Sequence, residues 1–361
     1  MITVDREALT DFAILALVRA GARAADAEVT AEVLVAADLA GVDSHGVARL
    51  RRYVEGLRKG TIDAAATPEV VGGRGGVSVV DGHNGLGQPV LCFAVDHAVD
   101  QAREHGVAAV AVRGSNHVGI AGWYSDRAAR AGAFALVTTN ATPQVAPAGA
   151  AEPMFGTDPL SYALPTSSGT LCYDGATSIV PRGKLERMHR EGKPMLEGWA
   201  VGPDGAACTD TARVVAGLKA REGYALLPLG GLGTRFGGHK GSGMGLLAEL
   251  LCGPLAGASW SKHTYGESGA DLGQFVLCLD VAALGDPQTV AGRVEAMAEE
   301  IRGAKRAAQD TPVRMPGDRR RTSTRQRSAE GVPLLDPVVE DLAEIAGSLG
   351  LEPLRSREPQ P

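Results

Sequence analysis

Apolar residues recur with a helical period over the first sixty residues of the chain. They predict three helices, over residues 5–20, 26–40 and 45–57. Gly21 and Gly60 are placed to end the first and the third of them, because glycine is the residue that most often follows a helix. The chain therefore begins with a helical segment.

Beyond about residue 70, short β-branched runs replace the helical period. We expect strands over 77–80, 107–112, 134–138 and 274–280, and helices over 89–104, 242–251, 286–308 and 337–349. Residues 139–185 are rich in Pro, Gly, Ser and Thr and predict a long functional loop, and residues 314–327 predict a basic loop. This mixture indicates an α/β lobe beside the helical one.

The composition is that of an ordinary globular protein, with 361 residues of which 44% are hydrophobic and 22% charged. The net charge of -6 disfavours nucleic acid as a partner, because phosphate binding requires a positive field. Met1 is not followed by a secretory leader, and no apolar stretch is long enough to span a membrane, so we expect a cytoplasmic protein. The five cysteines lack CxxC spacing and predict reduced thiols, with no metal site.

One segment has the spacing of a dinucleotide fingerprint. Gly243-Met244-Gly245 follows a Gly-rich loop rather than a strand, and no acidic residue stands at the end of a following strand. Glycines that pack a helix explain the spacing better, so we do not predict a Rossmann domain.

The segment 43–49 (DSHGVAR) combines a histidine and an arginine. A helix that starts here places His45 and Arg49 four residues apart, on one face. Reduction of a carbonyl group requires a proton donor, which an imidazole supplies, and a carboxylate anchor, which a guanidinium supplies. Ser44 can orient the imidazole through a hydrogen bond. The alternative is a helix cap followed by a His and an Arg on a solvated face.

Two further segments place polar side chains after apolar runs. His117 follows the predicted strand 107–112 and is a candidate for substrate contact or proton transfer, the alternative being an exposed histidine in a turn. Asp174 is a candidate partner for a histidine. The hydroxyls of Thr177 and Ser178 are candidates for holding cofactor phosphate or ribose, although ordinary turns use the same residue types.

A Gly-rich segment, 236–243, leads into the predicted helix 242–251. Lys240 beside a helix N-terminus suits an anion, but the segment lacks the ending of a P-loop, which disfavours ATP chemistry. The alternative is a flexible loop capped by Ser242. Arg314 opens a run of arginines that either contacts phosphate or is solvated.

In order and content, these segments resemble the malate/L-lactate dehydrogenase family that lacks a Rossmann fold. The matching stretches are DSHGVARL (43–50), DGHNGLGQ (81–88), RGSNHVGIAGWY (113–124), TTNATPQVAPAGA (138–150), FGTDPLSYALP (155–165), YDGATSIVPRGK (173–184), PLGG (228–231), GGHKGSGM (237–244) and RMPGD (314–318). So many short motifs in one order are specific, and the similarity covers nearly the whole chain.

The resemblance implies an α+β fold with two parts. One is a non-Rossmann NAD(P)-binding domain with a mixed or antiparallel sheet, and the other is a helical domain formed by the N- and C-terminal segments. The corresponding boundaries are 1–75, 76–285 and 286–361, with the last segment returning to the helical domain. The resemblance also implies a homodimer with its active site in a cleft near the subunit interface, and NAD or NADP as the cofactor.

The resemblance further implies a role for each matching residue. His45 matches the proton donor, with Ser44 and Asp174 as relay partners, and His117 matches a second acid–base or substrate-contacting histidine. Arg49 and Thr157 are the candidate substrate-binding residues, Arg49 for the carboxylate. The candidate cofactor contacts are Asp174, Gly175, Ala176, Thr177, Ser178, His239, Lys240, Gly241, Arg314, Pro316 and Gly317.

Two departures from the family pattern concern loop geometry: Asp158 replaces an Asn, and Pro181 precedes Arg182. The segment GGHKGS leans toward keto-acid or imine reductases, whereas SNHVGIAGWY is typical of malate-type members. We therefore predict NAD(P)H-dependent interconversion of a small 2-oxo acid and a 2-hydroxy acid. NADPH-dependent reduction of a cyclic 2-imino acid is the alternative, and a non-catalytic small-molecule binder is the third reading.

Overall fold

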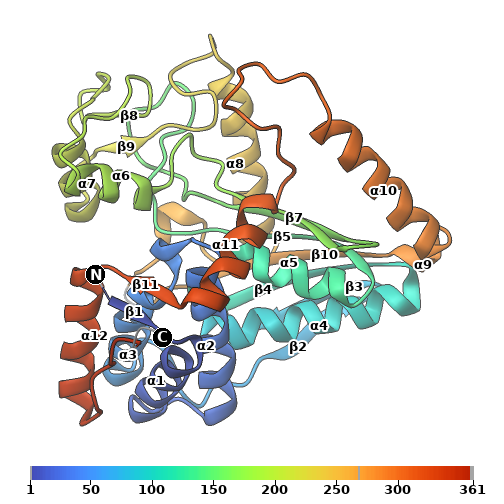
Figure 1. Cartoon of the computed structure of the whole chain (residues 1–361), viewed down its shortest axis with the longest axis horizontal. Helices are drawn as coiled ribbons and strands as arrows, with labels where there is room; N and C mark the ends of the chain where they lie inside the picture. Colours follow the sequence, from blue (N-terminus) through green and yellow to red (C-terminus); the bar gives the residue numbers. More distant parts are fainter. Residues whose placement is uncertain (1, 267–268, 358–361) are drawn as a thin grey trace.

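The ends of the chain form a helical layer in the computed structural model, which describes residues 2–266 and 269–357. Helices α1 (Arg6–Arg19), α2 (Ala24–Leu39), α3 (Leu50–Lys59) and α12 (Asp336–Leu349) lie together in one corner of the molecule (Figure 1). Strand β1 (Ile2–Val4) pairs antiparallel with β11 (Val332–Leu334), which joins the two ends.

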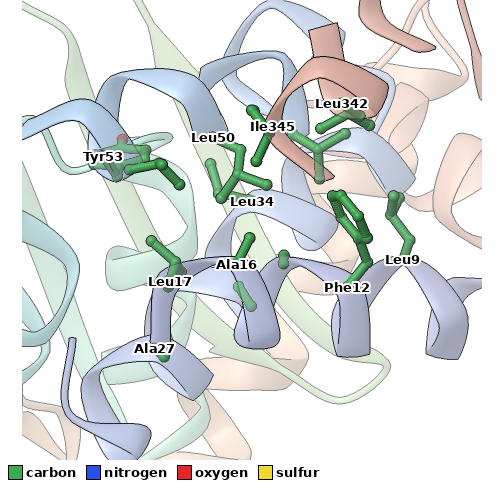
Figure 2. Close-up of a cluster of buried hydrophobic side chains, with 14 of the residues drawn as sticks. Leu9, Phe12, Ala16, Leu17, Ala27, Leu34, Leu50, Tyr53, Leu342 and Ile345 are labelled. Atoms are coloured by element: carbon green, nitrogen blue, oxygen red, sulfur yellow. The ribbon is translucent and has the colours of Figure 1, made fainter. Parts of the chain in front are cut away.

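An apolar cluster holds this layer together. Leu9 and Phe12 of α1 face Leu342 and Ile345 of α12, with Leu34 and Leu50 beside them (Figure 2). All six side chains are buried, so their removal from water stabilises the layer. Tyr53 of α3 lies at one edge of the same cluster.

A seven-stranded sheet forms the centre of the molecule, in the order β2-β3-β4-β10-β5-β6-β7. Its strands are β2 (Glu69–Arg74), β3 (Val77–Asp81), β4 (Val107–Ser115), β5 (Ala133–Thr139), β6 (Leu160–Thr166), β7 (Gly169–Gly175) and β10 (Leu272–Asp280). Only β3 and β4 are paired in parallel, and every other neighbouring pair is antiparallel. The sheet is therefore mixed and mainly antiparallel.

Two helices, α4 (Gly87–His105) and α5 (Ala121–Arg130), cover the sheet and pack against each other. Helix α4 lies on β4 and β10, and α5 lies on β5, β6 and β7. Val90, Val95 and Tyr124 are among the buried residues that join the helices to the strands. Helix α2 also packs against α4, so the helical layer and the sheet are in direct contact.

A third apolar cluster is formed by segments of residues 145–226. It is built from α6 (Arg182–Arg190), α7 (Thr211–Ala220) and the short strands β8 (Ala200–Val201) and β9 (Ala225–Leu226). Leu185, Val214 and Leu226 are buried in it. Helix α8 (Gly238–Cys252) follows, and then α9 (Val281–Leu284), α10 (Pro287–Arg302) and α11 (Asp318–Glu330) lead back to the helical layer (Figure 1).

Two expectations about loops were wrong. Residues 139–185 contain the hairpin β6–β7 and the start of α6. Strand β6 was not predicted because small residues, Ser161 and Ala163, occupy its buried positions in place of large apolar ones. Residues 314–327 contain most of α11, which has no buried residue and hence no apolar period to reveal it. Helix α10 also ends at Arg302, before the predicted residue 308.

Candidate active site

The segment 43–49 forms two short 3-10 turns, Asp43–His45 and Val47–Arg49, separated by Gly46 in an extended conformation. The expectation of one continuous helix through His45 and Arg49 was therefore wrong. The cause is Asp38 of α2, whose Oδ2 accepts a hydrogen bond of 2.8 Å from the Val47 N–H. A Cβ atom at position 46 would lie 1.8 Å from Asp38 Oδ1, so only glycine fits.

Asp38 is a site residue that the sequence analysis missed. Its carboxyl group is buried, and burial raises its pKa to about 8. Arg327 of α11 donates to the Asp38 carbonyl oxygen at 2.6 Å and also pairs with Asp43. The turn that carries His45 is thus fixed by two helices that are distant in sequence. The only signal in the sequence was a single acid in the apolar run 33–39.

Two histidines from different parts of the chain stack on each other in the site. The ring centroids of His45 and His117 are 5.8 Å apart, with an interplanar angle of 21°. His117 is supplied by the loop between β4 and α5, whereas His45 comes from the turn after α2. The structure thus brings together the two histidines that the sequence analysis singled out.

Hydrogen bonds orient both imidazoles. Ser44 Oγ lies 2.9 Å from His45 Nδ1. His117 Nδ1 receives a hydrogen bond of 3.3 Å from the Gly119 N–H and lies 2.6 Å from Tyr53 Oη. Because a backbone N–H can only donate, His117 Nδ1 is an acceptor and the ring proton lies on Nε2. Tyr53, which the sequence analysis missed, therefore connects the apolar cluster of Figure 2 to the site.

The electrostatic surroundings favour uncharged imidazoles. Burial and then the positive charges of Arg49 and Arg52 lower the pKa of His45 to about 4. Burial and then Arg52 lower the pKa of His117 well below its ordinary value. At neutral pH both rings are therefore neutral as long as nothing offsets the guanidinium charges.

Arg49 lies beside this pair, with one edge held by the protein. Its Nε donates to the Ser44 carbonyl oxygen at 2.7 Å. Burial lowers the pKa of Arg49, and the negative charge of Glu186 opposes this decrease. Within residues 2–266 and 269–357, Arg49 forms no ion pair. A Cβ atom at Gly183 would lie 2.5 Å from Ser44 Cβ, so the start of α6 abuts the same turn.

Asp174, at the end of β7, is bonded to the start of α5. Its Oδ2 accepts a hydrogen bond of 2.8 Å from the Gly122 N–H at the start of α5. Among the described residues no hydrogen bond joins Asp174 to His45, whereas the Ser44–His45 contact is present. A part for Asp174 in a proton relay stays a prediction.

The candidate cofactor residues on β7 and α8 come together through the backbone. The Leu229 N–H donates to the Thr177 carbonyl oxygen at 2.8 Å. A Cβ atom at Gly241 would lie 2.2 Å from the Leu229 carbonyl oxygen, so the first turn of α8 packs directly on this strand-like segment. The N-terminal end of α8 and the residues after β7 thus form one surface.

This surface suits a dinucleotide. A hollow of about 470 Å³ is lined by Phe236, His239, Lys240 and Gly241, and the exposed Lys240 forms no ion pair in the described part of the chain. The first N–H groups of α8 carry the positive end of the helix dipole, which favours phosphate. The formal fingerprint glycines Gly243 and Gly245 lie inside the same helix, and a Cβ atom at Gly245 would meet Phe155 and Thr177 at 3.4 Å.

Thr157 lies in the same region, next to two buried acids, Asp158 and Glu249. Its carbonyl oxygen accepts from the Thr177 N–H at 2.9 Å. The next residue, Asp158, is fully buried in the left-handed region at φ 38°, and burial together with Glu249 raises its pKa well above the ordinary value. Glu249 accepts from the Gly156 N–H at 3.1 Å and from the Ser261 N–H at 2.9 Å. Burial and the neighbouring Glu249 thus favour the protonated form of this carboxyl group.

The segment with Arg314, Pro316 and Gly317 lies beside β7 on the side of Asp174. A Cβ atom at Gly317 would lie 3.1 Å from the Cys172 carbonyl oxygen, and the exposed Arg314 precedes the buried Met315. The nearby Arg320 is one of the charges that act on Asp174. The cofactor candidates thus form two groups. One is at the start of α8, next to the residues that follow β7, and the other is at the start of α11, next to β7 itself.

The described residues hold neither a metal-binding cluster nor a helix that could span a membrane. No group of three or more His, Cys, Asp or Glu side chains in that part of the chain is arranged to hold a metal ion. None of its helices combines the length and the apolar character that crossing a membrane requires.

Comparison with known proteins agrees with this geometry. Residues 4–343 match the model of the malate/L-lactate dehydrogenase family. The chain is 36% identical over 355 residues to a malate dehydrogenase of Pyrococcus horikoshii, covering 98% of this chain and 97% of that protein. It is 33% identical to a Δ1-pyrroline-2-carboxylate/Δ1-piperideine-2-carboxylate reductase of Pseudomonas syringae pv. tomato, covering 89% of this chain and 90% of that one.

A solved structure has the same fold. The malate dehydrogenase of Entamoeba histolytica superposes with a TM-score of 0.93 at 28% identity, covering 97% of this chain and 98% of that chain. The motif order, the family match along residues 4–343 and the similarity to solved enzymes all agree. The chain belongs to the malate/L-lactate dehydrogenase family and is an NAD(P)-dependent oxidoreductase.

Proposed function

We propose that the chain interconverts a small 2-oxo acid and the corresponding 2-hydroxy acid, with His45 as the proton donor and Arg49 as the carboxylate anchor. The observation that carries this proposal is the stacked pair of neutral histidines next to an arginine that has no ion-pair partner among the described residues. A planar guanidinium binds a carboxylate through two parallel hydrogen bonds.

Binding of an anion prepares His45 for proton transfer. The charges of Arg49 and Arg52 contribute to the low pKa of His45. A substrate carboxylate next to Arg49 offsets part of that positive charge, so the His45 pKa rises toward the working range of an acid–base group. In the oxidation direction the same neutral imidazole accepts the proton of the hydroxyl group. Its hydrogen bond with Ser44 holds the ring in place for both directions.

His117 contributes a fixed hydrogen-bond donor. Its Nδ1 is occupied by the Gly119 N–H and Tyr53, so its Nε2–H is free to donate to the oxygen of the reacting carbonyl. A neutral imidazole is an effective donor for an oxygen on which negative charge develops.

The nicotinamide cofactor supplies the hydride when it is bound. We propose that Lys240 and the first N–H groups of α8 hold its phosphates, with the residues after Asp174 and the segment of Arg314 and Gly317 completing the site. Support comes from the close packing of Gly241 on the Leu229 backbone. A side chain at position 241 would not fit there, so the first turn of α8 presents backbone N–H groups at this point.

A second candidate activity is reduction of a cyclic 2-imino acid. It is supported by the 33% identity to the Pseudomonas syringae pv. tomato reductase. Arg49 would bind the carboxylate of either substrate, so the anchor alone does not separate the two activities.

We also propose a homodimer. Support comes from Met244, Leu247 and Leu250, which recur along one side of α8 and are exposed by 39%, 49% and 45%. An apolar face of this kind on a helix is typical of an interface. A solution mass of one chain would contradict this part of the proposal.

The activity is tested with purified protein, NADH or NADPH, and a panel of pyruvate, oxaloacetate and a cyclic imino acid. Loss of the near-ultraviolet absorbance of the reduced cofactor with a 2-oxo acid supports the proposal, and turnover of the imino acid alone supports the second candidate. Cofactor binding without turnover of any substrate would overturn both.

A further inference from the structure

Helix α11 connects the two regions that the proposed function uses. Its N-terminal end follows the proposed cofactor segment with Arg314 and Gly317, and its C-terminal end continues through β11 into the helical layer (Figure 1). None of the residues of α11 is buried. Burial of apolar side chains therefore does not hold this helix in place, and its position depends on polar contacts.

The first turns of α11 are bonded to the sheet, next to Asp174. Arg321 donates to the carbonyl oxygen of Thr170 in β7 at 3.0 Å. A Cβ atom at Gly122 would lie 2.6 Å from Arg320 Nη1 and 2.9 Å from Asp174 Oδ2, so these two side chains meet at the start of α5. The N-terminal part of α11 thus belongs to the surface that we propose for the cofactor.

The later turns of α11 cap the C-terminal end of α2. Ser323 Oγ donates to the Leu39 carbonyl oxygen at 3.0 Å, and Arg327 Nη1 donates to the Asp38 carbonyl oxygen at 2.6 Å. Ser323 and Arg327 lie on one face of α11 because they are one turn apart. The last carbonyl groups of a helix carry the negative end of its dipole, so a guanidinium is favourable there.

Arg327 also reaches the turn that carries His45. The same Nη1 atom pairs with the carboxylate of Asp43, the first residue of that turn. One nitrogen atom therefore joins α11, α2 and the turn. Asp43 is exposed, and an ion pair with an exposed partner adds little to the stability of a protein. Its main effect is thus on where the turn lies.

We propose that Arg327 is a positioning residue for His45, and that α11 transmits cofactor binding to the turn 43–49. Arg327 does not touch the reacting groups and acts through Asp38 and Asp43. Because the segment 314–317 is taken as part of the cofactor site and His45 as the proton donor, this role rests on the proposed function.

The docked form of α11 serves both sites. A helix held by polar contacts separates locally from its neighbours more readily than a buried one, because water replaces the lost hydrogen bonds. Contacts of a cofactor with the start of α11 require the helix to be docked on β7, and the Arg327–Asp43 pair requires it to be docked on α2. Cofactor binding therefore raises the fraction of molecules in which the turn is held. The 2-oxo acid then meets a better ordered His45 in the cofactor complex than in the free protein.

The test measures hydrogen exchange of peptides that cover residues 43–49 and 318–330, with and without saturating NADH or NADPH. In the wild type we expect the reduced cofactor to slow amide exchange in both segments by about tenfold. In Arg327→Gln the slowing in 318–330 should remain, whereas the slowing in 43–49 should fall below about twofold. The amides of Val47 and Arg49, which are hydrogen-bonded in the turn, report this change. A merely structural role would speed exchange by the same factor with and without cofactor.

Three further variants control the result. Arg325→Gln removes an exposed arginine of the same helix and should respond like the wild type. Arg327→Lys keeps a charged nitrogen, and since a single nitrogen makes both contacts, it should recover most of the response. Asp43→Ala removes the pair from the exposed side of the turn and should lose the response in 43–49, even if Arg327→Gln does not fold.

Two results would overturn the inference. One is a wild type that binds the reduced cofactor without any slowing of exchange in 43–49. The other is a wild-type response of 43–49 in Asp43→Ala or in a folded Arg327→Gln variant. A wild type that binds neither NADH nor NADPH would instead overturn the proposed function.

Discussion

The turn that carries His45 and the surface at the start of α8 are built in opposite ways. Three neighbouring segments fix the turn: Asp38 accepts a hydrogen bond from its backbone, Arg327 pairs with Asp43, and Gly183 packs against Ser44. At α8, by contrast, Lys240 is exposed and forms no ion pair in the described ranges. The proposed proton donor requires fixed placement, whereas the proposed surface for an exchanging cofactor requires groups that are free until the cofactor arrives. Substitutions in the two regions should therefore have different kinetic signatures.

The largest effect is expected from His45→Ala. Loss of the proposed proton donor should lower kcat by about 1000-fold, within the range of general acid catalysis, and leave the Kd of the reduced cofactor close to that of the wild type. Stopped-flow turnover and cofactor fluorescence titration measure the two quantities. His105→Ala, at the exposed end of α4, is the matched control. A parallel loss of cofactor affinity would contradict the separation of the two regions.

Arg49→Lys comes next in size. A point charge replaces a planar fork, so the KM of the 2-oxo acid should rise by about 100-fold while kcat changes much less. Steady-state kinetics at saturating cofactor give both constants. Arg58→Lys, exposed further along α3, should change neither. A KM within a few-fold of the wild-type value would remove Arg49 from the substrate site.

Asp38→Asn tests how the buried carboxyl group below the turn contributes to the stability of the protein, and does not test proton transfer by His45. The folded-state pKa of about 8 lies above the ordinary value of 3.8, so the folded protein keeps a proton that the unfolded chain releases. The stability from this group is complete below pH 3.8 and declines as the pH rises to about 8. Asparagine does not titrate and still accepts from the Val47 N–H.

At pH 8 the Asp38→Asn variant should therefore be more stable than the wild type, by up to about 5 kcal/mol, and the difference should vanish in acid. Denaturant unfolding between pH 5 and pH 9 checks this, with both proteins assayed at each pH. If the two proteins show the same dependence on pH, Asp38 is charged in the folded state and the account of the turn is wrong.

The smallest effect is expected from Lys240→Gln at the start of α8. Cofactor affinity should fall by about tenfold, with kcat at saturating cofactor nearly unchanged. The loss should shrink as salt rises, because the lost attraction is between exposed charges. Lys219→Gln on α7 serves as the control. An effect on kcat alone would place Lys240 in the catalytic region instead.

The sequence was informative where the apolar period was long. The helices of the first sixty residues and the strands around Val110 and Val137 were predicted because their buried positions are apolar. Helix α11 was missed because none of its residues is buried, and β6 because Ser161 occupies a buried position. The local pattern of apolar and polar residues carries no information on contacts between distant segments, such as those of α11 with the end of α2.

The same limit applies to the candidate site. His45, Arg49 and His117 were singled out by chemistry and motif, and the structure brings the two histidines into contact. The break at Gly46 could not be predicted, because it is imposed by Asp38 from the preceding helix. Arg52 resembled any surface arginine until its contact with Tyr265, more than two hundred residues away, became visible.

The bond between Asp43 and Arg327 has a consequence for how the enzyme is made. The ribosome completes the segment with His45 early, but Arg327 is added only when most of the chain has been synthesised. A nascent chain that already has its first helices and the segment 43–49 still lacks the Arg327 side chain that pairs with Asp43 in that segment. We therefore expect the newborn protein to gain catalytic competence late, after α11 has emerged and docked.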